Sequence, residues 1–145
     1  MTGHAPPFDV QIVLDCSEAH AQADFWAAAL GFEVEIDEEQ VRALLDRGVA
    51  TEDDVATHDG KLVWRGAAAI RDPDGLRPRW FFQDVPEPRT TKNRMHVDVR
   101  VGADRRADEV ARLEGLGATQ LYDGRLGTDT WVTMADPEGN EFCVT

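Results

Sequence analysis

The residues with the clearest capacity for chemistry lie on the alternating segment 94–101. His96, Asp98 and Arg100 occupy one side of this segment, and the other side is apolar. An imidazole titrates near neutral pH, so His96 can move a proton, bind a metal ion or hydrogen-bond a ligand. An arginine beside it can hold a carboxylate or a phosphate. We therefore expect His96 to be catalytic and Arg100 to bind ligand; the alternative is a buried His96 that Asp98 satisfies.

A second group of candidates lies on other predicted strands. Cys143 becomes a nucleophile only if a nearby cation lowers the pKa of its thiol, and a free cysteine is more often a small buried hydrophobic residue. Glu141 shares the strand face of Cys143 by parity. Trp80 and Trp131 can form the aromatic wall of a pocket for an organic ligand, whereas packing in the core is the alternative.

The elements that must position these residues are organised around a repeated tetrapeptide. Asp-Pro-Asp-Gly at 72–75 is matched by Asp-Pro-Glu-Gly at 136–139. Aspartate, proline and glycine suit the first, second and fourth positions of a tight turn. A strand-like run stands on each side of both tetrapeptides, so both predict β-hairpins.

The same order of elements occurs twice along the chain. Alternation of apolar and polar residues predicts strands, and helical spacing of apolar residues predicts helices. The first helix begins after Ser17, a good N-cap, and ends at Gly31. Residues 38–60 form a helical insert, and the prolines in 85–91 predict a linker. The predicted strands are 8–15, 32–36, 62–71 and 79–84 in the first half and 94–101, 119–123, 128–135 and 141–145 in the second, with helices at 17–30 and 104–116.

Composition limits the classes of protein and partner. A chain of 145 residues is the size of one domain. Its formal net charge of −13 argues against nucleic acid or an anionic membrane surface as a partner. The sequence shows no leader and no apolar run long enough to span a membrane, and its two cysteines suggest free thiols. We expect a cytoplasmic protein.

The chain resembles the vicinal oxygen chelate superfamily, which includes glyoxalases, bleomycin-resistance proteins and extradiol dioxygenases, and within it the glyoxalase-like domains. Phe25-Trp26 with Leu30-Gly31-Phe32, the segment 92–98 and the segment 136–142 carry this resemblance. It implies an α+β fold of two repeated βαβββ modules whose curved mixed sheets form a cup with the helices outside, and a homodimer. One domain then covers 1–145, with module 1 at about 8–84, the insert and linker given above, and module 2 at about 92–145.

The resemblance also implies where a metal would bind. Metal-using members take one side chain from the first strand and one from the last strand of each module, commonly His, Gln or Glu. The matching positions here are Gln11, Gln83, His96 and Cys143. Without a carboxylate at the final positions this is a weak donor set, so we expect no metal. A divalent ion held by Gln11, His96 and either Glu141 or Cys143 is the alternative.

The sequence therefore predicts a binding protein or a metal-independent enzyme that acts on a small organic molecule. The predicted ligand-binding residues come from both modules: Gln11, Gln83, His96, Arg100, Trp80, Trp131 and Cys143. Two alternatives stay open. One is a metal-dependent lyase or isomerase of the glyoxalase type, and the other is a resistance protein that sequesters a drug in the way bleomycin-binding proteins do. The insert 38–60 is either a lid over the cup or a decoration.

Overall fold

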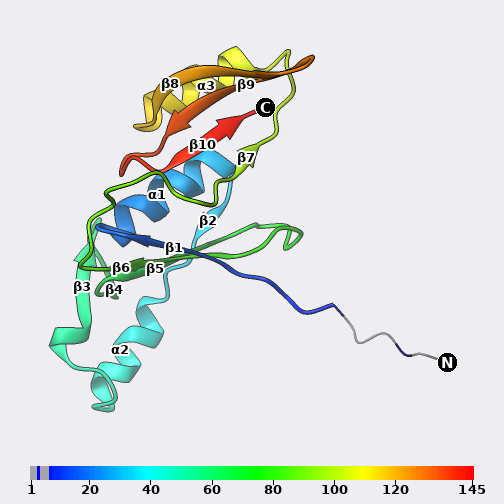
Figure 1. Cartoon of the computed structure of the whole chain (residues 1–145). Helices are drawn as coiled ribbons and strands as arrows, with labels where there is room; N and C mark the ends of the chain where they lie inside the picture. The colour runs from blue at the N-terminus through cyan, green and yellow to red at the C-terminus, as the bar shows by residue number, and fades with distance from the viewer. Residues whose placement is uncertain (1–2, 4–6) are drawn as a thin grey trace.

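The computed structural model describes residue 3 and residues 7–145. The other positions, with which the predicted domain begins, lie outside the described residues. The fold is α+β and contains two βαβββ modules (Figure 1). The first comprises β1 (Ile12–Cys16), α1 (Ala19–Leu30), β2 (Glu33–Val34), β5 (Ala67–Arg71) and β6 (Trp80–Asp84), and the second comprises β7 (Asp98–Val99), α3 (Arg106–Leu116), β8 (Thr119–Leu126), β9 (Asp129–Ala135) and β10 (Glu141–Val144).

Each module forms one four-stranded mixed sheet. The strand order is β1-β6-β5-β2 in the first sheet and β7-β10-β9-β8 in the second, so the two sheets have the same topology. In each sheet the first strand runs parallel to the last strand of its module, and the remaining pairs are antiparallel. The predicted repeat and fold class are thereby confirmed.

Both predicted hairpin turns are present. The backbone N–H of Gly75 donates to the carbonyl of Asp72 at 3.0 Å, and that of Gly139 donates to the carbonyl of Asp136 at 2.9 Å. Both glycines have positive φ, 67° and 87°. A side chain with Cβ would be strained in that conformation, so glycine is required there.

Residues 38–60 interrupt the first module as predicted, but the insert is longer than the sequence suggests. It contains α2 (Glu38–Asp46), a 3₁₀ turn η1 (Glu52–Asp54) and the hairpin of β3 (Val55–His58) with β4 (Lys61–Trp64). The predicted single strand 62–71 is therefore wrong. It breaks at Gly66, whose φ of 73° turns the chain from β4 into β5.

The start of α1 is also different from the prediction. Its N-cap is Glu18, not Ser17, and no side chain at that position caps the helix. The carboxylate of Glu138 instead accepts from the backbone N–H groups of both residues, at 2.6 and 3.0 Å. The second hairpin thus caps a helix of the first module, and a cap formed at such a sequence distance has no local signature.

One hydrophobic core joins the two modules. Helix α1 lies between the first sheet and β10 (Figure 1). The Trp26 ring centroid is 4.8 Å from that of Trp80 on β6 and 5.0 Å from that of Phe142 on β10. The two sheets are therefore held together through one aromatic cluster. Among the described residues, no helix has the length and apolar character needed to cross a membrane.

Candidate functional site

The second sheet has one face against the core and one face that is open. Alternation along β10 sends Phe142 and Val144 into the core, so Glu141 and Cys143 point to the open face. A hollow of about 400 Å³ lies on this face. We call it the second-sheet hollow; its lining residues are Lys92, His96, Asp98, Tyr122, Trp131, Thr133, Glu141, Cys143 and Thr145.

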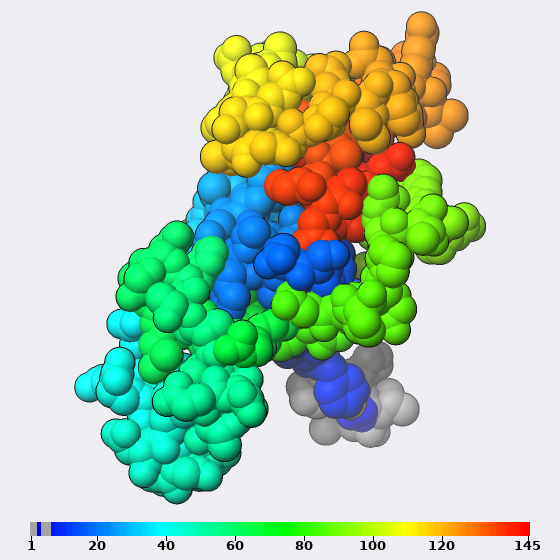
Figure 2. All heavy atoms as spheres, turned by 90° about the vertical axis from the view of Figure 1, so that its left-hand side faces the viewer, coloured from blue at the N-terminus to red at the C-terminus, as the bar shows by residue number. Residues whose placement is uncertain are grey.

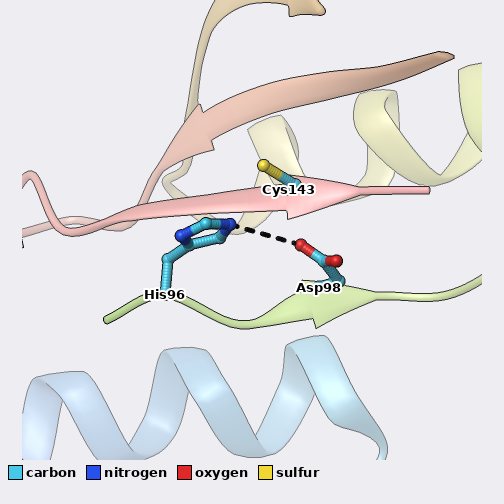
Figure 3. A group of neighbouring side chains, drawn as sticks. All are labelled: His96, Asp98 and Cys143. Carbon is cyan, nitrogen blue, oxygen red and sulfur yellow. Dashed lines mark ion pairs between the residues drawn. The ribbon is translucent and has the colours of Figure 1, made fainter. Parts of the chain in front are cut away.

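Three side chains with acid–base or ligating atoms meet in this hollow. Asp98 is the first residue of β7, His96 lies two residues before it, and Cys143 lies opposite Asp98 on β10 (Figure 3). The His96 Nε2 and Asp98 Oδ1 atoms are 3.5 Å apart, and the ligating atoms of all three residues lie within 4.8 Å of one another. A carboxylate at this distance favours a proton on Nε2, which leaves the lone pair on Nδ1. The imidazole can then accept a proton from a bound molecule.

Cys143 is a neutral thiol in this setting. Its side chain is 8% exposed, and burial raises the pKa of the thiol above its ordinary value of 9.0. A hydrogen-bond contact of 3.6 Å between Sγ and the Thr133 hydroxyl opposes this shift, and the Asp98 carboxylate adds to it. A neutral thiol is a poor nucleophile, so Cys143 serves as a wall of the hollow.

Trp131 forms the aromatic wall, and its position depends on a glycine. Gly124 of β8 is paired with Trp131 of β9, and the indole ring lies over the place where a Cβ of Gly124 would stand. A larger residue at 124 would displace the ring. The indole of Trp131 is therefore held over Gly124, and Trp131 and His96 both line the second-sheet hollow.

The first-sheet residues do not join this group. Gln11 accepts a hydrogen bond from the Arg79 guanidinium, and Gln83 donates to Asp15 at 2.7 Å. A separate hollow of about 540 Å³, the first-sheet hollow, lies on the open face of that sheet beneath the insert; its lining includes His20, Glu35, Trp64, Arg71, Arg79 and Phe81. Within one chain the two hollows share no lining residue.

Strand pairing also corrects the predicted register of Gln83. Thr133, the third residue before the second turn motif, pairs with Cys143. The equivalent residue before the first motif is Ala69, and it pairs with Phe81. Phe81 therefore takes the place equivalent to Cys143, and the sequence count missed it by two residues because the first hairpin is longer.

Two other predicted binding residues lie outside both hollows. Trp80 is 6% exposed and packs on Trp26 in the core, so its predicted contact with ligand is not supported by its position. Arg100 is exposed and does not line the second-sheet hollow. Conversely, the sequence did not point to Tyr122 as a lining residue, because an irregularity in β8 between Gln120 and Tyr122 breaks the alternation on which the face assignment relies.

The residues present do not fit a four-ligand chelate. The four implied positions hold Gln11, Phe81, His96 and Cys143, of which the phenyl ring has no donor atom and the glutamine oxygen is already bound by Arg79. His96, Asp98 and Cys143 in the second-sheet hollow offer one nitrogen, one oxygen and one sulfur donor. This mixture suits Zn²⁺ better than a hard ion such as Mg²⁺ or Ca²⁺. The thiol would first have to lose its proton.

Comparison with known proteins gives consistent results. A search of curated proteins found no match. Among solved structures, a glyoxalase/bleomycin resistance/dioxygenase family enzyme from Burkholderia phytofirmans is 11% identical, with a TM-score of 0.60, and 92% of this chain and 94% of that one are covered.

Two fosfomycin resistance proteins named FosX also align, both with a TM-score of 0.60. The one from Mesorhizobium loti is 6% identical, with coverage of 99% of this chain and 90% of that one. A variant from Listeria monocytogenes, complexed with Mn(II) and a dihydroxypropylphosphonic acid, is 12% identical, with coverage of 99% and 91%. At such identities the likeness establishes the fold alone.

The family follows from the sequence match, which spans most of the chain. Residues 11–145 match the family described as the glyoxalase-like domain. This range includes both turn motifs, the aromatic pair on α1 and the His96 segment. The chain belongs to the glyoxalase-like domain family, within the vicinal oxygen chelate superfamily.

Proposed function

We propose that this protein binds a small organic molecule in the second-sheet hollow without a metal ion, with His96 as the group that exchanges a proton with it. The observation that carries the proposal is the His96–Asp98 pair in a hollow that Trp131 also lines. A pocket that combines an aromatic surface with a few convergent polar groups is the usual form of a site for an organic ligand. Cys143 and Thr133 close its floor.

The charges in the hollow indicate which ligand it accepts. The Lys92 Nζ atom is 2.9 Å from Glu141 Oε2, so the Glu141 carboxylate neutralises the charge of Lys92. Asp98 then leaves the hollow net negative while His96 is neutral. A negative site repels phosphonates and carboxylates and attracts neutral or cationic molecules. We therefore propose an aromatic ligand that is neutral or cationic, unlike the phosphonic acid bound by the Listeria protein.

We further propose that two copies of the chain form the complete cup. Each chain presents two separate half-sites, one on each sheet. The edge strands β1 and β7 each have one unpaired side, and Val13, Tyr122 and Met95 are exposed on the described surface. Pairing the first sheet of one copy with the second sheet of another would bury these side chains and enclose the ligand. Light scattering after gel filtration tests this directly, with a dimer mass as the expected result.

A thermal-shift screen tests ligand binding. The panel contains aromatic amines and neutral aromatic ketones, with phenylphosphonate and fosfomycin as anionic comparators. We expect the amines or ketones to raise the melting temperature of the wild type and the anions to leave it unchanged. Trp131→Phe and His96→Ala should reduce the shift, whereas Glu114→Ala, at an exposed position of α3 that lines neither hollow, is the matched control. Equal shifts with the anions would reject the charge argument.

Turnover separates an enzyme from a sequestering protein. Each ligand that raises the melting temperature is incubated with the protein and followed by mass spectrometry. Conversion that His96→Ala abolishes supports proton transfer by His96, because the binding wall of Trp131 remains in this variant. Tight binding with an unchanged ligand instead identifies a sequestering protein.

A metal-dependent lyase or isomerase is the second candidate, and the donor cluster of His96, Asp98 and Cys143 is the observation that favours it. Metal analysis of protein purified without a tag and without added metal tests it. One equivalent of bound metal that is lost in His96→Ala would replace our first proposal. Melting curves with Zn²⁺, Mn²⁺ and Ni²⁺ provide the independent readout.

A further inference from the structure

A second cluster of ligating atoms lies where the insert meets α1, and its residues line neither of the two hollows. Asp24 projects from α1, and His58 and Asp59 lie at the end of β3 and the turn that follows it. The His58 Nε2 atom is 2.7 Å from Asp24 Oδ2 and 3.6 Å from Asp59 Oδ2. Segments that are 34 residues apart in sequence thus direct an imidazole and two carboxylates to one point. Figure 2 shows the insert hairpin against α1.

The geometry of this cluster is fixed by groups outside it. The ring of His20, one helical turn before Asp24, stacks on that of His58 with centroids 5.1 Å apart and an angle of 25° between the planes. The His20 Nε2 atom is itself 2.8 Å from the carbonyl of Trp64 on β4. The His58 ring is therefore held in plane, with Nε2 facing the two carboxylates. A preorganised donor set loses less entropy when it binds an ion.

The cluster is accessible and carries excess negative charge. The side chains of His58, Asp24 and Asp59 are 28%, 44% and 80% exposed, so an ion can enter from solvent. Lys61 is paired with His58 across the hairpin, but within the described part of the chain it forms no ion pair with either carboxylate. Two carboxylates outweigh the single positive charge that one imidazole can carry, so the cluster keeps negative charge for a cation to balance.

We propose that Asp24, His58 and Asp59 form a binding site for a divalent cation of the Zn²⁺ type. The imidazole nitrogen is a borderline donor that favours Zn²⁺ over Mg²⁺ or Ca²⁺, and carboxylate oxygens also bind Zn²⁺, with water at the remaining position. Nε2 binds the ion as neutral imidazole, and any proton on that atom passes to the buffer. The site would join the β3–β4 hairpin to α1. Because Trp64 and His20 line the first-sheet hollow, an ion bound here fixes one wall of that hollow.

Calorimetric titration of the full chain with ZnCl₂ tests the site. All proteins carry His96→Gln, which disables the other donor cluster, so the result does not depend on the proposed function of the second-sheet hollow. Asp24→Asn, Asp59→Asn and His58→Gln are each added to this background. Asp46→Asn, which removes an exposed carboxylate at the end of α2, is the matched control.

We expect one equivalent of Zn²⁺ to bind to the background protein and to Asp46→Asn with the same affinity. Each of the three site substitutions should weaken binding at least tenfold, because each removes one of three protein ligands. If His58→Gln fails to fold, the exposed Asp59→Asn still decides the question. No binding to the background protein, or binding that Asp24→Asn and Asp59→Asn leave unchanged, would overturn the proposal.

Discussion

The first aspartate of each turn motif can be replaced by alanine to test what holds the two modules together. Asp136→Ala is the test, and Asp72→Ala, at the equivalent position of the first motif, is the control. The Asp136 carboxylate is buried and accepts from the Gln22 side-chain amide at 2.8 Å and from the Trp26 indole at 3.1 Å, both on α1. It also accepts from the backbone N–H groups of Glu138 and Asn140, each at 2.9 Å. One side chain therefore joins the second hairpin to the helix of the first module.

The expected magnitude follows from these donors. Asp136→Ala leaves five donor groups without this acceptor, namely the four above and the side-chain amide of Asn140, in a region where Gln22 and Trp26 are almost fully buried. At about 1 kcal/mol or more for each unsatisfied donor, unfolding should become easier by about 5 kcal/mol. That is a large fraction of the ~5–15 kcal/mol that stabilises a typical domain.

Asp72→Ala removes the equivalent carboxylate from the first hairpin and should cost much less. Its partners are the backbone N–H groups of Asp74, Leu76 and Arg77 and the Arg77 guanidinium, all within five residues and on a loop that water reaches. The Asp72 side chain is itself only 3% exposed, but Asp74, Leu76 and Arg77 are exposed. Water therefore reaches these donors once the carboxylate is removed, and we expect a cost of about 1 kcal/mol.

Urea denaturation at pH 7, followed by circular dichroism, measures both costs. The midpoint of Asp136→Ala should fall much further than that of Asp72→Ala, with little change in the denaturant slope. Equal costs for the two variants, or a cost below about 1 kcal/mol for Asp136→Ala, would refute the argument that Asp136 holds the modules together.

Three further predictions concern the site, the helix cap and the dependence on pH. Gly124→Ala should push Trp131 off the sheet, shift its indole resonance in NMR spectra and weaken ligand binding at least fivefold, at a stability cost of about 1–2 kcal/mol. Glu138→Gln keeps a cap oxygen but loses the charge at the start of α1, and should lower the free energy of unfolding by about 0.5–1 kcal/mol in urea titrations. The Arg79 hydrogen bonds hold the pKa of Glu35 below its usual 4.5. The Glu35–Arg79 pair therefore stabilises the fold fully above pH 4.5, and this stabilisation is lost as the pH falls through the lower pKa of the folded state. In urea denaturation between pH 3 and 6, Arg79→Gln should reduce this pH-dependent part of the free energy of unfolding by at most about 1 kcal/mol.

The sequence predicted those features of the fold that depend on local patterns. Both tight turns, a helix that ends at Gly31 and the succession of strands and helix along each module follow from turn residues and from periodicity. It could not predict the capping of α1 by Glu138, because that contact joins residues about 120 positions apart. The break at Gly66 was also missed, since one glycine inside an apolar run does not reveal that β4 pairs with β3.

The site was predictable in part for the same reason. Alternation placed His96 and Cys143 on faces that the structure brings together, and Trp131 lines the same hollow. Alternation alone could not tell that Trp80 faces the core, because a tryptophan satisfies either face of a strand. The position of Phe81 opposite Ala69 depends on the length of the first hairpin loop, which strand patterns do not specify.

The most direct test of the proposed metal-independent site is calorimetric titration of EDTA-treated protein with the aromatic ligand that gives the largest thermal shift. We predict the same dissociation constant before and after EDTA, a loss of at least tenfold in affinity for His96→Ala and Trp131→Phe, and a change of less than twofold for Glu114→Ala. Binding that disappears with EDTA and returns with Zn²⁺, or that is unaffected by His96→Ala and Trp131→Phe, would contradict the account.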